Sequence, residues 1–321
     1  MKVVLCPRYG SPDLLEVREI EKGAAEENEV LVKVHAASVN ALDWRKSSGS
    51  PFLVRLVEGL RKPKRPRLGV DVSGVVEALG RGAQEFHVGD EVFGIAYGAF
   101  GEYVSAAESE IVLKPSRTSF ESAAAVPIAA ITALQSLRDT AGLRPGQRVL
   151  VNGAGGGVGT FAVQIAKALG AEVTAVSSAP NLELLRSIGA DHVLDYAQVD
   201  FTRGEQHYDV ILDLHPSHSN SDYKRVLNPE GICIPVGFGG MWHLISVALR
   251  SSFASKTHGK RVRLMIAKPN KKDLGVLRDL LDAGKIVPVI DRRYPLDQAR
   301  EGIRYLQTGR ARGKVIVSVA V

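Results

Sequence analysis

The stretch 152-NGAGGGVGTFAVQIAKALGAEVTAVSS-178 decides the fold, because it joins a glycine-rich turn to two different apolar patterns. The residues before the turn, Arg148–Ala154, form an apolar run typical of a buried strand. After the turn, apolar residues recur with the period of one helix face, at Val158, Phe161, Ala162, Ile165, Ala166 and Leu169. AEVTAVSS at 171–178 predicts another strand, so the stretch indicates a strand–turn–helix–strand unit.

The glycine turn has the spacing of a dinucleotide-binding fingerprint, A-x-G-x-x-G at Ala154, Gly156 and Gly159. Small residues allow a tight turn in which backbone N–H groups approach a pyrophosphate, and Gly159 allows close packing of helix on strand. The helix N-terminus adds partial positive charge. We therefore expect cofactor contacts from the residues of this turn: Ala154, Gly156, Gly157, Val158 and Gly159.

The end of the second strand predicts which dinucleotide is bound. An acidic residue about 20 positions after the turn would bind the ribose 2′-hydroxyl of NAD, but residues 173–182 are VTAVSSAPNL. Ser177, Ser178 and Asn181 offer neutral hydrogen bonds where a carboxylate would repel a 2′-phosphate. This favours NADPH over NADH, and the alternative is that the two serines only form the turn.

Strand and helix patterns continue to alternate downstream, which predicts a doubly wound parallel sheet and an α/β fold class. The helix is expected at NLELLRSIGA, and the strands at HVLDY, YDVILDL and GICIPVG. Loops at the carboxyl ends of such strands line the ligand crevice. They give four more candidate cofactor contacts, Tyr196, Leu214, Gly237 and Phe238. Tyr196 would stack near the adenosine or be an edge residue, and Gly237 would admit the nicotinamide or only shape a turn.

Short strands and turns at both ends of the chain predict a second, partly closed β-domain whose sequence brackets the first. Its last strands are expected at KIVPVID (285–291) and GKVIVSV (313–319). We expect this catalytic β-domain to comprise residues 1–117 and 270–321, and the nucleotide-binding domain to comprise 118–269.

Composition excludes several classes of protein. Of the 321 residues, 45% are hydrophobic and 24% charged, as in globular proteins, and no apolar run approaches the roughly 20 residues of a membrane span. We expect no integral membrane association. The opening MKVVLCPRYG has no apolar region typical of a secretory leader, so we expect a cytoplasmic location. Cys6 and Cys233 are too few for a disulfide framework.

The net charge of +6 includes one dense basic run, RKPKRPR at 61–67. Two prolines interrupt it and no nucleic-acid motif surrounds it, so we expect a solvated loop and no nucleic-acid partner. Peripheral contact with an anionic membrane is a further hypothesis for this run.

The chain closely resembles the zinc-free quinone oxidoreductase and alkenal reductase branch of the medium-chain dehydrogenase/reductase superfamily, which is zeta-crystallin-like. The resemblance covers nearly the whole chain, through SVNALDWRKSSG, GVDVSGVVEALG, FHVGDEVFG, AAAVPIAAITALQSL, the glycine fingerprint, IGADHVLDY and GRARGKVIV. It implies a GroES-like β-domain, a Rossmann domain and a homodimer or larger homo-oligomer. It also implies NADPH contacts at the glycine turn, at Ser177, Ser178 and Tyr196, around Gly237 and Phe238, and near Arg312. It places Asn40 and Thr132 beside the nicotinamide.

The branches of this superfamily differ in whether they bind zinc. Its alcohol dehydrogenases hold a catalytic Zn²⁺ through cysteine, histidine and acidic ligands, and the reductase branch does not. This chain has Asn40 where the zinc branch has a cysteine, and Gly69-Val70-Asp71 where that branch has G-H-E. No cysteine lies between Cys6 and Cys233, so the four-cysteine structural lobe is missing too. We therefore expect no metal.

Without a metal, positioning and hydrogen bonds to a developing oxyanion would have to lower the barrier. Asn40 is the first candidate, because its amide can donate without titrating. Asp43, Trp44 and Arg45 come second, with Trp44 either lining the substrate cleft or packed as a core aromatic. Tyr97 is a further catalytic candidate, and the proton donor stays open.

Three classes of function remain. The leading hypothesis is a zinc-independent NADPH-dependent oxidoreductase that transfers hydride to a small molecule, either a quinone or an α,β-unsaturated carbonyl. An enoyl reductase or dehydrogenase of a biosynthetic pathway would share every motif. A non-catalytic protein, crystallin-like or sensory, would bind NADPH without reducing an acceptor.

Overall fold

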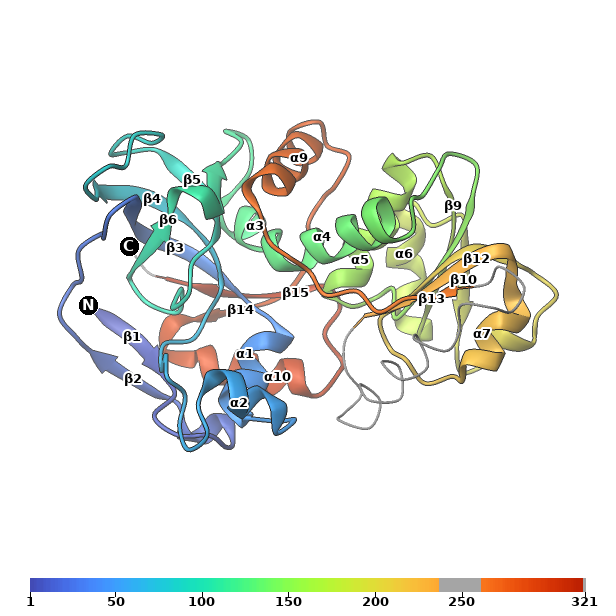
Figure 1. The fold of residues 1–321 in the computed structure, drawn as a ribbon, viewed down its shortest axis with the longest axis horizontal. Coiled ribbons are helices and arrows are strands. Elements are labelled where there is room, and N and C mark those ends of the chain that lie inside the picture. The colour runs from blue at the N-terminus through green and yellow to red at the C-terminus, as the bar shows by residue number, and fades with distance from the viewer. Residues whose placement is uncertain (237–260, 320–321) are drawn as a thin grey trace. The chain divides into compact units, whose positions relative to one another are not determined.

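The computed structural model describes residues 1–236 and 261–319, and the chain divides into two compact units (Figure 1). Unit 1 comprises Met1–Ile131, Pro269–Gly284 and Pro288–Val321, and unit 2 comprises Thr132–Lys268 and Lys285–Val287. Unit 1 thus continues past residue 117, the boundary expected from the sequence. The reason is that α3 (Phe120–Ala124) packs against the sheet of unit 1.

Unit 2 contains a six-stranded parallel sheet with the order β10-β9-β8-β11-β12-β13. The order is that of a Rossmann fold, in which the chain reverses direction across the sheet between β8 and β11. It confirms the doubly wound sheet predicted from the strand and helix patterns. The strands are β8 (Arg148–Asn152), β9 (Glu172–Ser177), β10 (His192–Asp195), β11 (Tyr208–Asp213), β12 (Leu227–Pro235) and β13 (Arg261–Val262).

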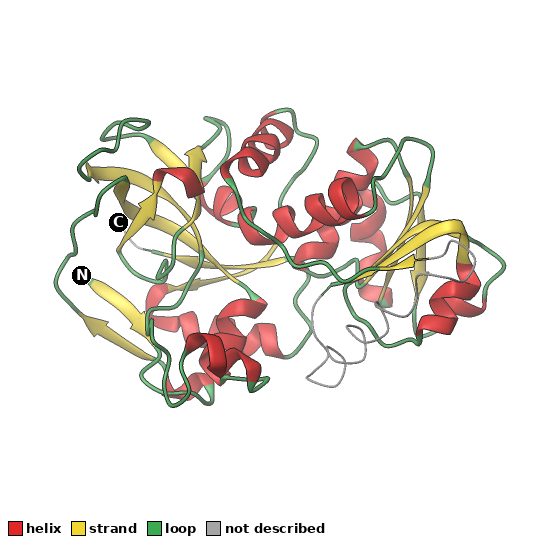
Figure 2. Ribbon diagram, viewed as in Figure 1, coloured by secondary structure: helices red, strands yellow, loops and turns green. Residues whose placement is uncertain are grey.

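Helices pack on this sheet, as the red and yellow elements of Figure 2 show. They are α5 (Gly157–Ala168), α6 (Leu182–Ser187) and α7 (Asn220–Val226). The sequence predicts one apolar face for α5, yet every residue from Gly159 to Ala166 is buried. Contacts of Gln164 explain why the polar side of α5 is buried as well. The Gln164 amide donates to Val287 O (3.0 Å) and accepts from Val287 N (2.7 Å). A segment more than 100 residues away therefore covers the polar side of the helix.

Unit 1 is built on a sheet with the order β14-β15-β3-β4-β5-β7, and β6 also pairs with β3. Its pairs are antiparallel except for β14 with β15. The strands are β3 (Glu29–Val39), β4 (Asp71–Leu79), β5 (Glu91–Ile95), β6 (Tyr103–Ala107), β7 (Ile111–Leu113), β14 (Ile290–Pro295) and β15 (Lys314–Ser318). β1 (Lys2–Leu5) and β2 (Glu16–Glu19) form a separate hairpin.

The predicted strand at 285–291 is wrong for its first residues. β14 begins only at Ile290, and Lys285–Val287 belongs to unit 2 instead. The backbone of Val287 in this segment bonds to Gln164 of α5, and Ile286 is buried beside it, so the segment is fixed in unit 2 without forming a strand.

Several helices accompany the sheet of unit 1. They are α1 (Ala41–Ser48), α2 (Leu53–Glu58), α3, α9 (Lys271–Asp282) and α10 (Ala299–Gln307). α4 (Pro127–Leu134) carries the chain across the division between the units.

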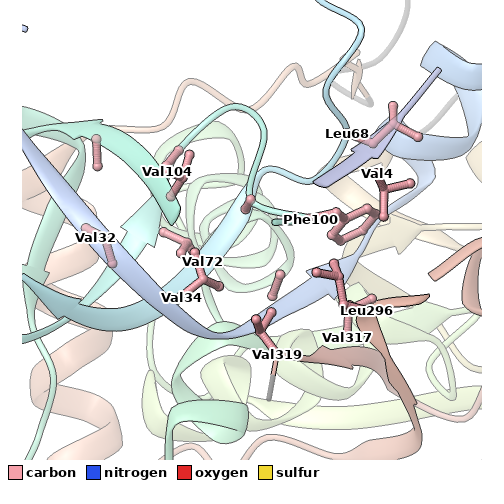
Figure 3. Close-up of a cluster of buried hydrophobic side chains, with 14 of the residues drawn as sticks. Val4, Val32, Val34, Leu68, Val72, Phe100, Val104, Leu296, Val317 and Val319 are labelled. Atoms are coloured by element: carbon pink, nitrogen blue, oxygen red, sulfur yellow. The ribbon is translucent and has the colours of Figure 1, made fainter. Parts of the chain in front are cut away.

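Valines and a few larger side chains fill the core of unit 1, and Figure 3 shows part of this cluster around Phe100. β3 contributes Val32 and Val34, which point the same way because side chains two apart on a strand share a face. β15 contributes Val317 from the other end of the sequence. Burying each such side chain stabilises the fold by about 1.5–3 kcal/mol, so the core ties the C-terminal strand to the N-terminal part of the unit.

Candidate functional site

The carboxyl ends of the central strands of unit 2 meet at one edge of its sheet. Asn152 at the end of β8 lies in register with Val176 of β9 and with Asp213 at the end of β11. The glycine turn follows β8 directly, so it lies where ligands bind in open parallel sheets.

The turn is packed too closely for larger side chains. Gly153 and Ala154 both donate their backbone N–H groups to Val176 O, at 3.1 and 3.0 Å. A Cβ atom on Gly159 would lie 2.6 Å from the Cα atom of Ala154, so only glycine lets α5 approach the turn this closely. Gly156 is the N-cap of α5, and the first turn of the helix has no acidic residue. Helix N–H groups and positive partial charge are therefore presented without a competing carboxylate.

Ser177, Asn181 and Gly155 form a small polar cradle beside this turn. Asn181 Nδ2 donates to Ser177 Oγ (2.9 Å) and to Ser178 Oγ (3.3 Å). A Cβ atom on Gly155 would lie 2.5 Å from Asn181 Nδ2 and 2.7 Å from Ser177 Oγ. Asn181 Oδ1 is buried and has no hydrogen-bond partner among the described residues. Buried polar atoms are normally satisfied, so this cradle fits a polar ligand group.

The two other predicted contacts on described strand ends lie next to the same edge. Tyr196 is exposed and donates its backbone N–H to Ser177 O (3.1 Å), and Leu214 donates its own to Asn152 O (3.0 Å). Asp195 is in register with Ser177, but its carboxylate accepts from Ala197 N (3.0 Å) and Gln198 Nε2 (3.2 Å). Gly237 and Phe238 lie outside the described residues.

A buried network beneath the turn was missed by the sequence analysis. Asp213 is fully buried; it accepts from Asn152 Nδ2 (2.8 Å), from His215 N (3.1 Å) and from the hydroxyl of Tyr223. Burial, and then the charge of Asp213, raises the pKa of Tyr223 well above its usual value, so the phenol stays a donor. The network fixes the ends of β8 and β11, between which the sheet order reverses. An aspartate closing the apolar run YDVILD was the sequence feature that could have indicated it.

Unit 1 contains a second buried polar cluster, formed by Ser38, Asn40, Asp71 and Lys314. Asp71 Oδ2 accepts from Ser38 Oγ (2.6 Å), Asn40 Nδ2 (2.9 Å) and Lys314 Nζ (3.3 Å). Its other oxygen accepts from Ile128 N (3.0 Å). Lys314 Nζ also donates to Asn40 Oδ1 (2.7 Å), and the side chain of Lys314 is 3% exposed. The cluster thus pairs a buried cation with a buried carboxylate.

These partners determine how the amide of Asn40 is oriented. A lysine ammonium only donates and a carboxylate only accepts, so Oδ1 faces Lys314 and Nδ2 faces Asp71. The amide also donates to Ser38 O at 3.3 Å. Asn40 therefore gives both amide hydrogens to protein acceptors, and donation to a substrate would require one of these bonds to break.

Asp43 holds the start of α1 in place. Its carboxylate accepts from the backbone N–H of Asn40 (2.8 Å) and from that of Gly69 (3.0 Å), and only 1% of the residue is exposed. Burial raises the pKa of Asp43 to about 6, while the two N–H donors oppose the shift. This geometry makes Asp43 a helix-capping residue that ties α1 to the segment before β4.

The remaining candidates are distributed over both units. Trp44 is half-buried and packs against the core of unit 1, which agrees with its interpretation as a core aromatic. Arg45 is half-buried, and burial lowers its pKa. Tyr97 is exposed beneath the guanidinium of Arg65, 5.6 Å from the ring centre. Thr132 is buried on α4 in unit 2, and Arg312 is exposed in unit 1.

Neither unit offers a metal centre among residues 1–236 and 261–319, where no group of three or more His, Cys, Asp or Glu could hold an ion. Within the same residues, no helix is long and apolar enough to cross a bilayer.

A Rossmann unit with a glycine turn, joined to a β-rich unit with a buried polar cluster, defines the class of two-domain nucleotide-dependent oxidoreductases. Comparison with known proteins agrees. Residues 26–116 match the model of the alcohol dehydrogenase GroES-like domain, and residues 188–317 match that of a zinc-binding dehydrogenase. The GroES-like domain expected from the sequence is thereby confirmed.

Three relatives define the family more closely. A chloroplast envelope quinone oxidoreductase homolog of Arabidopsis thaliana is 33% identical over 94% of this chain and 93% of its own. A 2-methylene-furan-3-one reductase of Solanum lycopersicum is 32% identical over 96% of this chain and 76% of its own. The structure of the quinone oxidoreductase from Coxiella burnetii matches with a TM-score of 0.88 and 30% identity, over 100% of this chain and 99% of the other. The chain belongs to the medium-chain dehydrogenase/reductase family, among the quinone oxidoreductases, and is an oxidoreductase.

Proposed function

We propose that the protein is a zinc-independent NADPH-dependent reductase of quinones or α,β-unsaturated carbonyls. The observation that carries the choice of cofactor is the neutral cradle of Gly155, Ser177 and Asn181 at the end of β9. The names of two relatives, a quinone oxidoreductase homolog and a furanone reductase, support the choice of acceptor. When bound, NADPH would supply the hydride.

The cradle fits the 2′-phosphate end of the cofactor. Ser177 Oγ accepts from Asn181 (2.9 Å), so the hydroxyl hydrogen of Ser177 is left to donate to a further acceptor. The nearby carboxylate of Asp195 is engaged by its own turn. The site therefore offers the Ser177 hydroxyl as a donor to an anionic group, and the positive end of α5 is available to the pyrophosphate. Tyr196 and Leu214 would line the same edge, and Arg312, Thr132, Gly237 and Phe238 stay predicted contacts.

The buried cluster of unit 1 would perform the work that zinc performs in the alcohol dehydrogenases of this family. Zinc does not fit these residues, because Lys314 already brings a cation to within 2.7 Å of Asn40 and 3.3 Å of Asp71. The fixed positive charge of Lys314 would stabilise negative charge that develops on a substrate oxygen. Asn40 would act as the positioning residue that keeps the ammonium in place. Homodimerisation and a cytoplasmic location stay predictions.

The cofactor proposal is tested by Ser177→Asp, which places a carboxylate in the cradle. NADPH affinity should fall by at least about tenfold, with little change for NADH, because a like charge near the 2′-phosphate costs at least about 1.4 kcal/mol. Ser187→Asp adds the same charge at an exposed position of α6 and is the matched control. An unchanged ratio of NADPH to NADH affinity in Ser177→Asp would show that the 2′-phosphate binds elsewhere.

The acceptor proposal is tested by NADPH oxidation with an ortho-quinone, a short enal, an enoyl thioester and an alcohol–aldehyde pair, each with and without a chelator. Chelator-insensitive reduction of the quinone or enal supports the proposal. Reduction of the enoyl thioester alone would instead indicate a biosynthetic enoyl reductase. Tight NADPH binding without reduction of any acceptor would indicate a non-catalytic protein. In an active enzyme, Asn40→Ala should lower kcat more than NADPH affinity.

A further inference from the structure

A surface at the end of α2 combines exposed apolar and basic side chains. We call it the α2 patch. Its apolar members are Phe52, Leu53, Leu56, Val57 and Leu60, and its basic members are Arg61, Lys62, Lys64 and Arg65. No residue of α2 itself is buried. The apolar members are exposed to the extent of 58%, 40%, 55%, 75% and 61% in that order, far above ordinary core residues.

The apolar residues lie on one side of the helix. Leu53, Leu56 and Val57 are spaced i, i+3 and i+4, which places them on a single face of α2, and Leu60 follows directly after the C-cap Gly59. Single exposed apolar residues are common on protein surfaces, but a contiguous group of large ones marks a binding surface. This helix therefore presents its apolar face outward instead of to the core.

The fold holds the patch in this shape. Tyr9 donates its hydroxyl to Gly59 O (2.6 Å), and Lys64 donates its backbone N–H to Glu58 O (2.6 Å). The guanidinium of Arg55 stacks on the ring of Tyr9 and donates to Gly49 O (3.1 Å). Because Tyr9 and Gly49 belong to other parts of unit 1, the exposed leucines are presented by a built surface.

The charge around the apolar face selects its occupant. Residues 52–67 contain six Lys and Arg and a single acidic residue, Glu58. Arg61, Lys62, Lys64 and Arg65 are exposed, and among residues 1–236 and 261–319 none of the four makes an ion pair with a carboxylate. Pairing two copies of the patch would bring these cations together, which disfavours a second copy of the chain. A nucleic acid would match the cations but not the leucines.

We propose that the α2 patch docks the protein reversibly on the surface of an anionic phospholipid bilayer. The apolar face of α2 would enter the interface between headgroups and acyl chains, and the four cations would lie against the lipid phosphates. Basic residues beside an apolar helix face are the usual composition of such interfacial segments. The inference does not depend on the proposed reaction, since it concerns neither the glycine turn nor the Lys314 cluster.

Vesicle sedimentation of the full chain tests the proposal without any substrate. Binding should be at least about tenfold stronger to phosphatidylcholine vesicles with about 30 mol% phosphatidylglycerol than to phosphatidylcholine alone, and should weaken between about 0.1 and 0.5 M salt. Arg61→Gln with Lys62→Gln should lower the affinity about 25-fold, at about fivefold for each cation. Leu56→Glu with Val57→Glu should lower it at least about tenfold.

Matched variants distinguish this patch from the rest of the surface. Arg18→Gln with Arg81→Gln removes two exposed cations elsewhere in unit 1, and Val88→Glu changes a valine that is 64% exposed, between Leu56 (55%) and Val57 (75%). All variants should unfold at the wild-type temperature, and these controls should bind vesicles like wild type. Equal binding to neutral and anionic vesicles, or equal losses in the controls, would overturn the proposal. It would also be overturned if duplex DNA bound with no effect of the leucine changes, or if those changes altered only the oligomeric state.

Discussion

Replacing Lys314 with methionine tests whether the cation and carboxylate buried in unit 1 stabilise each other. Lys314→Met leaves Asp71 fully buried with three hydrogen-bond donors, Ser38, Asn40 and Ile128, but without a cation. Removing one partner of a buried ion pair costs about 3–5 kcal/mol. Because three donors remain, we expect the free energy of unfolding to fall by about 3 kcal/mol. Asp71→Asn should cost a similar amount, since it leaves Lys314 charged and buried.

The double variant separates the pair from the individual side chains. In the Asp71→Asn background, Lys314→Met no longer leaves a buried charge uncompensated, so it should cost at least about 2 kcal/mol less than it does in the wild-type background. Urea unfolding followed by fluorescence measures the free energy of unfolding of wild type, the two single variants and the double variant. Trp44 packs on the core of unit 1, and replacing Trp242 with phenylalanine makes it the sole tryptophan of the chain.

The slope of the urea transition should stay the same in all four proteins, which would show that the same unit unfolds. Lys2→Met removes an exposed lysine of unit 1 and should change stability by less than about 0.5 kcal/mol. If Lys314→Met costs the same in the wild-type and the Asp71→Asn backgrounds, the two charges are not coupled and the argument for a zinc-like role of Lys314 fails.

Three further outcomes are expected. Because burial raises the pKa of Asp43 to about 6 from 3.8, the native state holds that proton more tightly than the unfolded chain. The stability of wild type relative to Asp43→Asn should therefore fall by about 2 kcal/mol between pH 4 and pH 7, and a rise over that interval would contradict the assignment. Gly159→Ala should cost about 1–3 kcal/mol, because its Cβ would lie 2.6 Å from Ala154 Cα; Gly275→Ala, with open space around its Cβ, should not destabilise the protein. Tyr223→Phe should cost about 1–3 kcal/mol through the lost bond to Asp213, whereas Tyr196→Phe, at an exposed position, should leave the melting temperature unchanged.

Local patterns were enough to predict the elements around the glycine turn. The apolar run, the glycines and the helical period at 148–178 are properties of neighbouring residues, and β8, α5 and β9 lie where they indicate. The burial of both sides of α5 was not predictable in this way, because its second cover comes from Val287.

The candidate site likewise contains residues that local sequence could identify and one residue that it could not. Asn40 and Asp71 could be identified by comparison with the zinc positions of the family, and Ser177 and Asn181 by their distance from the turn. Lys314 was missed because its partners lie 274 and 243 residues away in sequence. A lysine that opens the apolar strand KVIVS was the available indication, but an exposed strand-end lysine would give the same pattern. Whether such a lysine is buried or exposed depends on the tertiary fold.

The place of β15 in the sheet has a consequence for synthesis of the chain. β15 covers residues 36–39 of β3 and carries Lys314, so neither the edge of β3 nor the charge of Asp71 is satisfied until the C-terminal segment is made. At about 5–20 residues per second, the 274 residues from Asn40 to Lys314 take about 14–55 s to translate. During that time the nascent chain exposes the unpaired edge of β3. Such edges can pair with other chains and so lead to aggregation, and chaperones bind nascent chains that expose them. Unit 1 is thus completed only after unit 2 has been made, although β3 precedes unit 2 in the chain.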